Sequence, residues 1–218
     1  MSTSMIQLLV LAGIAIFLIL RLRSVLGTRE GFEKPPLPRE TARPGPAFEV
    51  IEGGGVDRDI TDHVDEGTTA AKALARMKTV EPSFNVGEFL SGARGAYEMI
   101  LMAFERGDLA DIRPFLSDEV YQSFAEVVEA REAQGLTIDA TFVGVSGVDL
   151  REAEFTESTK RAELTVRFIG ELTSVVRDRG GEIVEGDPNA IQRQSDIWTF
   201  ARDMGSDDPN WQLVATGE

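Results

Sequence analysis

RAELTVRFIGELTSVV, residues 161–176, alternates polar and apolar side chains along its length. This period of two is typical of a β-strand with one face buried and the other in water. Thr137–Leu150 and Ile191–Asp203 show the same period, and a short last strand is expected over Trp211–Thr216. Because the segments follow one another with turn residues between them, we expect one antiparallel sheet.

Two helical segments precede these strands. Val86–Arg106 follows Asn85, a residue type favoured at helix N-caps, and ends before Gly107. A second helix is expected to start at Ser117 and to run to Gln134. Helices followed by a run of adjacent strands predict an α+β domain, with the helices packed on one face of the sheet.

The first of these helices contains two glycines, Gly92 and Gly95. Glycine within a helix costs about 1 kcal/mol relative to alanine. We therefore expect another part of the molecule to pack very close to them.

The N-terminal region has a different composition. Met5–Leu20 contains one polar side chain, Gln7, and no charge, and the apolar stretch continues to Leu26. At about 1.5 Å per residue a helix over residues 5–26 is about 33 Å long, against a hydrocarbon core of about 30 Å. We therefore predict a transmembrane anchor over residues 1–26, with the lipid bilayer as the partner of residues 5–26.

A cleaved secretory signal is the alternative for this segment. It is disfavoured because no basic residue precedes the apolar run and because Arg21 and Arg23 lie where cleavage is expected. Arg29 and Lys34 add to the basic residues after the run. The positive-inside rule then places the N-terminus outside and the C-terminal domain in the cytoplasm, as a single-pass protein.

Residues 27–66 are predicted to be a flexible linker, since five of the nine prolines lie between residues 35 and 46 and three glycines follow at 53–55. Residues 67–83 are predicted to form an amphipathic helix that leads into the body. Its basic side chains favour contact with a membrane surface, and packing on the body is the alternative, because its apolar face is mostly alanine. The predicted membrane-surface contacts are Arg21, Arg23, Lys72, Arg76 and Lys78.

The composition argues against several classes of function. The formal net charge is −15, and nucleic-acid binding needs Lys and Arg on phosphates, so we expect no RNA or DNA partner. With His63 as the one histidine and no cysteine, a Ser-His-Asp triad, a cysteine nucleophile and a His-rich metal site are excluded. Tyr97, Tyr121 and Asp196 remain as candidates for acid–base work, but no spacing marks a base beside an oxyanion donor. We therefore expect no enzyme activity, no cofactor and no metal.

Three segments carry motifs of a known family: Phe89–Phe124, Val166–Ile191 and Ser195–Thr216, the last with DIWTF at 196–200 and DPNW at 208–211. They resemble the C-terminal domain of Tim-forty-four, the import scaffold of the mitochondrial inner membrane. The whole chain looks like the alphaproteobacterial members, which pair such a domain with a membrane span. The resemblance implies, for residues 84–218, a cone-shaped α+β fold akin to nuclear transport factor two, with a large apolar cavity.

The resemblance also implies a function. The expected role is that of a membrane-anchored adaptor in the bacterial inner membrane, whose cone domain recruits a protein partner or client in protein translocation or membrane-protein assembly. Residues 27–83 do not match the region with which the mitochondrial protein engages the import channel and its Hsp70 motor, so chaperone recruitment does not carry over; contact with a chaperone or the translocon stays open as a partner but has no support from the N-terminal region. The alternative is a small-molecule or lipid binder, or an isomerase-like enzyme, of the same fold.

Side chains that alternate on one face of the predicted sheet are the candidates for a pocket or a partner-binding surface. Plain core packing is the alternative for all of them. The candidates are Phe142, Val166, Phe168, Trp198, Phe200 and Trp211.

Overall fold

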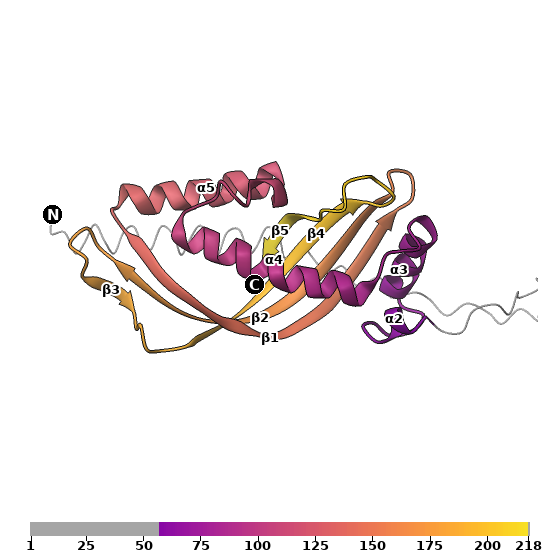
Figure 1. Cartoon of the computed structure of the whole chain (residues 1–218), viewed down its shortest axis with the longest axis horizontal. Coiled ribbons are helices and arrows are strands. Elements are labelled where there is room, and N and C mark those ends of the chain that lie inside the picture. The colour runs from indigo at the N-terminus through magenta and orange to yellow at the C-terminus, as the bar shows by residue number, and fades with distance from the viewer. Residues whose placement is uncertain (1–56, 218) are drawn as a thin grey trace, which may run out of the picture. The chain divides into compact units, whose positions relative to one another are not determined.

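A computed structural model describes residues 57–217, in which helices come first and strands follow (Figure 1). The elements are α2 (Arg58–Thr61), α3 (Thr69–Val80), α4 (Val86–Arg106), the 3-10 turn η1 (Arg113–Phe115), α5 (Asp118–Ala133), β1 (Thr137–Thr156), β2 (Arg161–Arg177), β3 (Ile183–Gly186), β4 (Gln192–Asp203) and β5 (Gln212–Gly217). The predicted α+β class, with helices before an antiparallel sheet, is confirmed.

The sheet is organised around β2. Its strand order is β1-β2-β4-β5, and β3 pairs with the C-terminal end of β2. All of these strand pairs are antiparallel. The pairing of β1 with β2 shifts register at three places, and such bulges bend and twist a strand. Figure 1 shows β1 and β2 curving around α4, so the bulges help to form a concave face for the helix.

The core lies between α4 and this concave face. On β2, Leu164, Val166 and Phe168 are fully buried, at the alternate positions that the sequence predicts. From α4, Tyr97 and Ile100 are equally inaccessible. The sheet residues and the helix residues therefore belong to one apolar cluster.

The ends of α4 follow from its local sequence. The Asn85 side chain accepts a hydrogen bond from the Glu88 N–H at 2.8 Å, which caps the first turn. Gly107 ends the helix in the left-handed conformation, at φ 81°. The predicted bounds of this helix are confirmed.

Within the predicted linker at 27–66, residues 58–61 instead form helix α2. The Asp57 side chain caps this helix, and Ile60 is buried in the core cluster. The Asp59 carboxylate accepts hydrogen bonds from the backbone N–H groups of Val86 and Gly87, at 2.8 and 3.1 Å. This short helix is therefore fixed to the start of α4.

The predicted membrane anchor falls outside the described residues, as do the linker residues before 57. Among the helices at residues 57–217, none combines the length and the apolar character needed to cross a bilayer.

Candidate functional site

The inner face of α4 takes part in a partly buried polar cluster. The Tyr97 ring stacks on Phe168, with 4.6 Å between ring centroids and 11° between planes. Its hydroxyl donates a hydrogen bond to Asp196 Oδ2 at 2.5 Å, and the Gln194 amide donates to that hydroxyl at 3.2 Å and to Asp196 at 2.9 Å. Burial, and then the Asp196 carboxylate, raise the pKa of Tyr97, so this phenol stays protonated and acts as a donor.

This cluster unites two of the candidates for acid–base work, Tyr97 and the partly exposed Asp196, but it does not expose Tyr97. Tyr97 has no accessible surface, and a side chain at Gly170 would overlap its hydroxyl. The third candidate, Tyr121, lies on α5, with the Arg113 guanidinium 4.6 Å from its ring centroid. Tyr97 has a structural role: its ring packs on Phe168 of β2 and its hydroxyl is hydrogen-bonded to Asp196 of β4, so it holds α4 on the sheet.

The six predicted pocket residues divide into two groups. Val166, Phe168 and Trp198 are buried in the core around Tyr97, and Phe142 is partly buried beside the same ring. Core packing, the alternative reading, accounts for these four. Phe200 and Trp211 line a hollow on the surface, but Phe200 is only 2% exposed and belongs to the core as well, whereas Trp211 is partly buried.

That hollow lies along the N-terminal half of α4 and has a volume of about 360 Å³. Gly92 and Ala96 form part of the helix side. Trp211 packs on Phe89 with ring centroids 4.7 Å apart, and is 6.0 Å from Phe84. The aromatic residues at the hollow are Phe84, Phe89, Phe115, Phe200 and Trp211.

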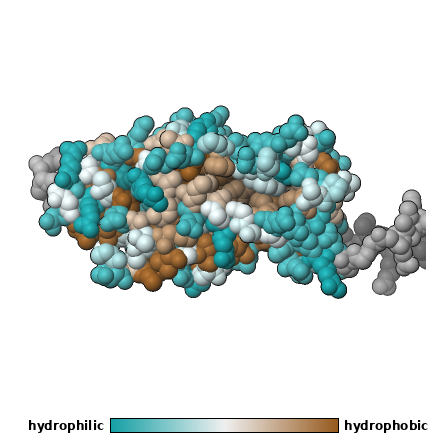
Figure 2. Space-filling view, viewed as in Figure 1, coloured by the Kyte–Doolittle hydropathy of each residue, from teal (hydrophilic) through white to brown (hydrophobic). Residues whose placement is uncertain are grey.

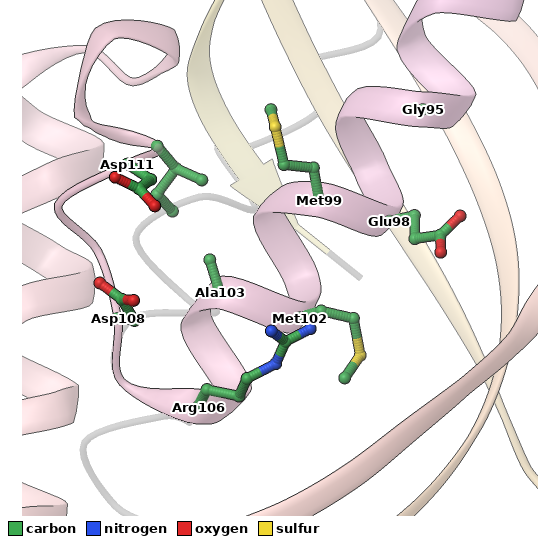
Figure 3. Close-up of a pocket in the computed structure, with 9 residues that line it drawn as sticks. Gly95, Glu98, Met99, Met102, Ala103, Arg106, Asp108 and Asp111 are labelled. Carbon is green, nitrogen blue, oxygen red and sulfur yellow. The ribbon is translucent and has the colours of Figure 1, made fainter.

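A second hollow, of about 320 Å³, continues along the C-terminal half of the same helix. Figure 3 shows Asp108 and Asp111, on the connection between α4 and η1, across from Met99 and Ala103. The two hollows share no lining residue, and Gly95 of one is next to Ala96 of the other in the chain. We call the two hollows together the α4 groove; the residues of α4 that line it are Glu88, Phe89, Gly92, Ala93, Gly95, Ala96, Glu98, Met99, Met102, Ala103 and Arg106.

The expectation that Gly92 and Gly95 receive a close contact is wrong for the part of the chain that the structure describes. A Cβ atom added at either glycine would meet no atom within 4 Å. Both glycines face the groove and leave it open. Figure 2 shows weakly and strongly hydrophobic surface between hydrophilic patches in the middle of the molecule.

Carboxylates dominate the charged residues of the α4 groove. Five of them, Glu81, Glu88, Glu98, Asp108 and Asp111, line the groove beside one guanidinium, that of Arg106. The Glu81 carboxylate accepts a hydrogen bond from the Arg202 guanidinium at 2.6 Å and one from the Gly205 N–H at 2.9 Å. Burial alone disfavours its charge, but these two hydrogen bonds outweigh burial and lower the pKa of Glu81, so it is ionised at neutral pH.

The sequence model of the Tim44-like domain matches residues 70–218. The chain belongs to the Tim44-like domain family. Curated relatives include the human "Mitochondrial import inner membrane translocase subunit TIM44", which is 27% identical over 150 residues, covering 67% of this chain and 33% of the relative. The Caenorhabditis elegans "Probable mitochondrial import inner membrane translocase subunit tin-44" is 24% identical over 164 residues, covering 73% and 38%. The match to this Tim44-like chain thus spans only about a third of each relative.

Among solved structures, the Tim44-like chain is similar to the crystal structure of the intermembrane space region of the chloroplast protein ARC6. The TM-score is 0.39 at 13% identity, over 60% of this chain and 92% of that one. A likeness at this score carries no argument about the fold. The cone-shaped fold akin to nuclear transport factor two therefore stays a prediction.

The predicted localisation, a single-pass protein of a bacterial inner membrane with a cytoplasmic domain, is wrong. The relatives from human, nematode and Arabidopsis thaliana are all named as subunits of the mitochondrial import inner membrane translocase. No helix within residues 57–217 of the Tim44-like chain could span a bilayer. The likeness to alphaproteobacterial members stays a prediction.

The predicted membrane-surface contacts of the Tim44-like domain have different surroundings. Arg21 and Arg23 lie outside the described residues, and Lys72 is exposed on α3. Arg76 forms an exposed ion pair with Glu157 at 3.5 Å.

Among Lys72, Arg76 and Lys78, which the structure describes, Lys78 is the most enclosed. Its ammonium lies 2.8 Å from Asp57 and 2.7 Å from Asp59. Burial disfavours its charge, but the two carboxylates outweigh burial and raise the pKa of Lys78. Its charge is thus already matched within the domain, and a role of the basic residues at a membrane stays a prediction.

Proposed function

We propose that this Tim44-like domain is a protein-binding adaptor in protein transport, and that it holds its partner in the α4 groove. The observation that carries the proposal is the open groove with its aromatic side, in a family whose curated relatives are named as translocase subunits. Trp211, which is only partly buried, is the proposed anchor, because large aromatic side chains contribute most at protein interfaces.

Binding fits the α4 groove better than catalysis does. Its lining combines aromatic and aliphatic side chains with carboxylates. The hydroxyl of Tyr97, the acid–base candidate with a raised pKa, is enclosed on the opposite face of α4. The absence of enzyme activity is part of this proposal.

Site-specific photo-crosslinking in cells tests the proposal. A photoreactive amino acid replaces Met99, which lies in the groove and is 40% exposed. The matched control position is Val143 on β1, which is 52% exposed and lines neither hollow of the groove. We expect subunits or clients of a protein-transport machinery to crosslink from position 99 and not from position 143. Equal patterns from both positions, or no protein adduct from position 99, would contradict the proposal.

A small-molecule or lipid binder is the second candidate. The larger hollow, at about 360 Å³, falls within the range of about 300–1,000 Å³ that is typical of small-ligand pockets. Native mass spectrometry of the purified full-length protein separates the two functions. The adaptor proposal expects no stoichiometric small molecule. A retained metabolite or lipid that is lost in Trp211→Ala would favour the second candidate.

A further inference from the structure

We infer that residues 57–64 form a strap that opens while the rest of the domain stays folded, and that the closed strap holds the aromatic end of the α4 groove ready for a partner. This inference rests on the proposed function, since it names a regulation of the same groove. Two observations carry it: few contacts hold the strap, and those contacts fix the segment that lines the aromatic end.

The strap makes little apolar contact with the domain. Its helix α2 has four residues, and Ile60, which is 5% exposed, is the buried one among them. Val64 adds a partly buried side chain against the core. Helix α4, by contrast, buries eight residues between Val86 and Met102. Because apolar burial is the main stabilising contribution, the strap is expected to open far more often than the domain unfolds.

Charged side chains supply the rest of the hold. The Lys78 ammonium, in the last turn of α3, lies 2.8 Å from Asp57 and 2.7 Å from Asp59. The Asp59 carboxylate also accepts hydrogen bonds from the N–H groups of Val86 and Gly87, at 2.8 and 3.1 Å. The side chains of Asp59 and Lys78 are each 18% exposed, so loss of one leaves the other poorly solvated. These contacts therefore form and break together, which makes the strap a two-state element.

The closed strap fixes both ends of the connection between α3 and α4. Lys78 lies just before this connection, residues 81–85, and the N–H of Val86 lies just after it. An open strap therefore loosens the connection at both ends. The connection supplies four of the residues that line the hollow around Trp211: Glu81, Ser83, Phe84 and Asn85.

A closed strap favours binding in the groove. A lining that is already ordered loses less conformational entropy when a partner docks, so the affinity is higher. By linkage, a bound partner favours the closed strap to the same extent. Residues 1–56 enter the described domain at Asp57, so a pull on them acts on the strap before it reaches α4. The strap thus couples the preceding chain to the groove.

Hydrogen exchange of the full-length protein, read by mass spectrometry, tests the opening. The N–H groups of residues 60–64 are hydrogen-bonded within the closed strap, so their exchange reports on it. After correction for intrinsic rates, we expect them to exchange at least about a hundredfold faster than the buried amides of β2. Lys78→Gln and Asp59→Asn should each raise the strap rate by a further factor of about five or more.

Matched variants separate the strap from its surroundings. Arg76→Gln, on the same helix as Lys78, removes a basic side chain whose ion pair is exposed on both sides, so the strap rate should not change. Lys78→Arg keeps a charge beside the two aspartates and should keep the strap slow. Asp59→Asn removes no basic residue, so the same result from it and from Lys78→Gln excludes an effect of lost positive charge alone.

Photo-crosslinking from position 99 tests the coupling to the groove. The double variant K78Q/D59N removes the whole charge contact and should leave the strap mostly open. The yield of adducts with transport proteins should then fall by at least about threefold, because only the closed fraction binds well. Arg76→Gln should keep the yield of the wild type.

Three results would overturn the inference: equal protection of strap and β2 amides, a strap rate that Lys78→Gln raises no more than Arg76→Gln, or an undiminished adduct yield in K78Q/D59N. If position 99 yields adducts that do not depend on the strap, the inference falls and the proposed function stands. If position 99 yields no protein adduct in the wild type, the proposed function fails and the coupling with it, while hydrogen exchange still decides whether the strap opens.

Discussion

The two faces of α4 are built from opposite kinds of side chain. On the inner face, Tyr97 and Ile100 are fully buried, and Tyr97 fills the space that a side chain at Gly170 would need. On the outer face, Gly92 and Gly95 leave open space beside Met99. One face therefore stabilises the domain, and the other leaves room for a partner.

Whether a glycine can be replaced without loss of stability depends on the surface that it faces. In α4 the glycines widen a groove, whereas on β2 a glycine lets a helix approach the sheet. The first kind can be replaced at little structural cost, and the second cannot.

The largest effect is expected for Tyr97→Ala. It removes a fully buried ring that stacks on Phe168 and lies 4.8 Å from Trp198, together with the hydrogen bond to Asp196. The free energy of unfolding should fall by about 3–5 kcal/mol. Urea denaturation measures it. Tyr97→Phe keeps the ring and removes only the hydroxyl, so it should cost about 1–3 kcal/mol. Equal losses in the two variants would show that the ring is not what fixes α4 to the sheet.

A smaller loss, of about 1–3 kcal/mol, is expected for Gly170→Ala, because the new methyl group overlaps the Tyr97 hydroxyl. The matched control is Gly144→Ala on the neighbouring strand, where an added Cβ meets no described atom within 4 Å. The control should change stability by less than about 0.5 kcal/mol. Thermal unfolding of both variants provides the measurement, and an equal effect at the two sites would count against the close approach of α4.

Much of this arrangement is predictable from local sequence. Asn85 and Gly107 predict the ends of α4, because a capping side chain and a left-handed glycine are local requirements. The alternation in residues 161–176 predicts the buried face of β2. These features depend only on neighbours in the chain.

The groove is not predictable in the same way. Trp198 and Trp211 look alike in sequence, yet Trp198 lies under Tyr97 in the core and Trp211 lines the surface hollow. Gly170 rather than Gly92 receives the close contact. Both outcomes depend on where α4 crosses the sheet, which is set by tertiary packing that a single sequence does not reveal.

Glu81, which lines the α4 groove, makes the stability of the domain depend on pH. The folded-state pKa of Glu81 lies below its ordinary value of 4.5, so this carboxylate stabilises the fold above pH 4.5. That stability is lost as the pH falls below 4.5 and through the lowered pKa. Glu81→Gln should therefore lose less stability than the wild type between neutral pH and about pH 3. Urea denaturation across this range measures the two slopes, and parallel slopes would contradict the prediction.

The smallest effect has the opposite sign. Gly92→Ala and Gly95→Ala should each stabilise the domain by about 0.5–1 kcal/mol, because alanine favours the helix and meets no described atom. Gly107→Ala is the control, and it should destabilise, since its φ of 81° disfavours any side chain. Differential scanning calorimetry compares the three variants. A loss of stability in Gly92→Ala or Gly95→Ala would mean that the outer face of α4 is packed after all.

The register shifts of β1 also bear on aggregation during folding. β1 is 20 residues long and lies at the edge of the sheet. A regular edge strand of that length offers a template on which another unfolded chain can add a strand and aggregate. Three bulges interrupt the even spacing of its N–H and C=O groups, so a foreign strand finds only short stretches in register. The irregularity that curves the sheet thus also protects newly made chains from one another.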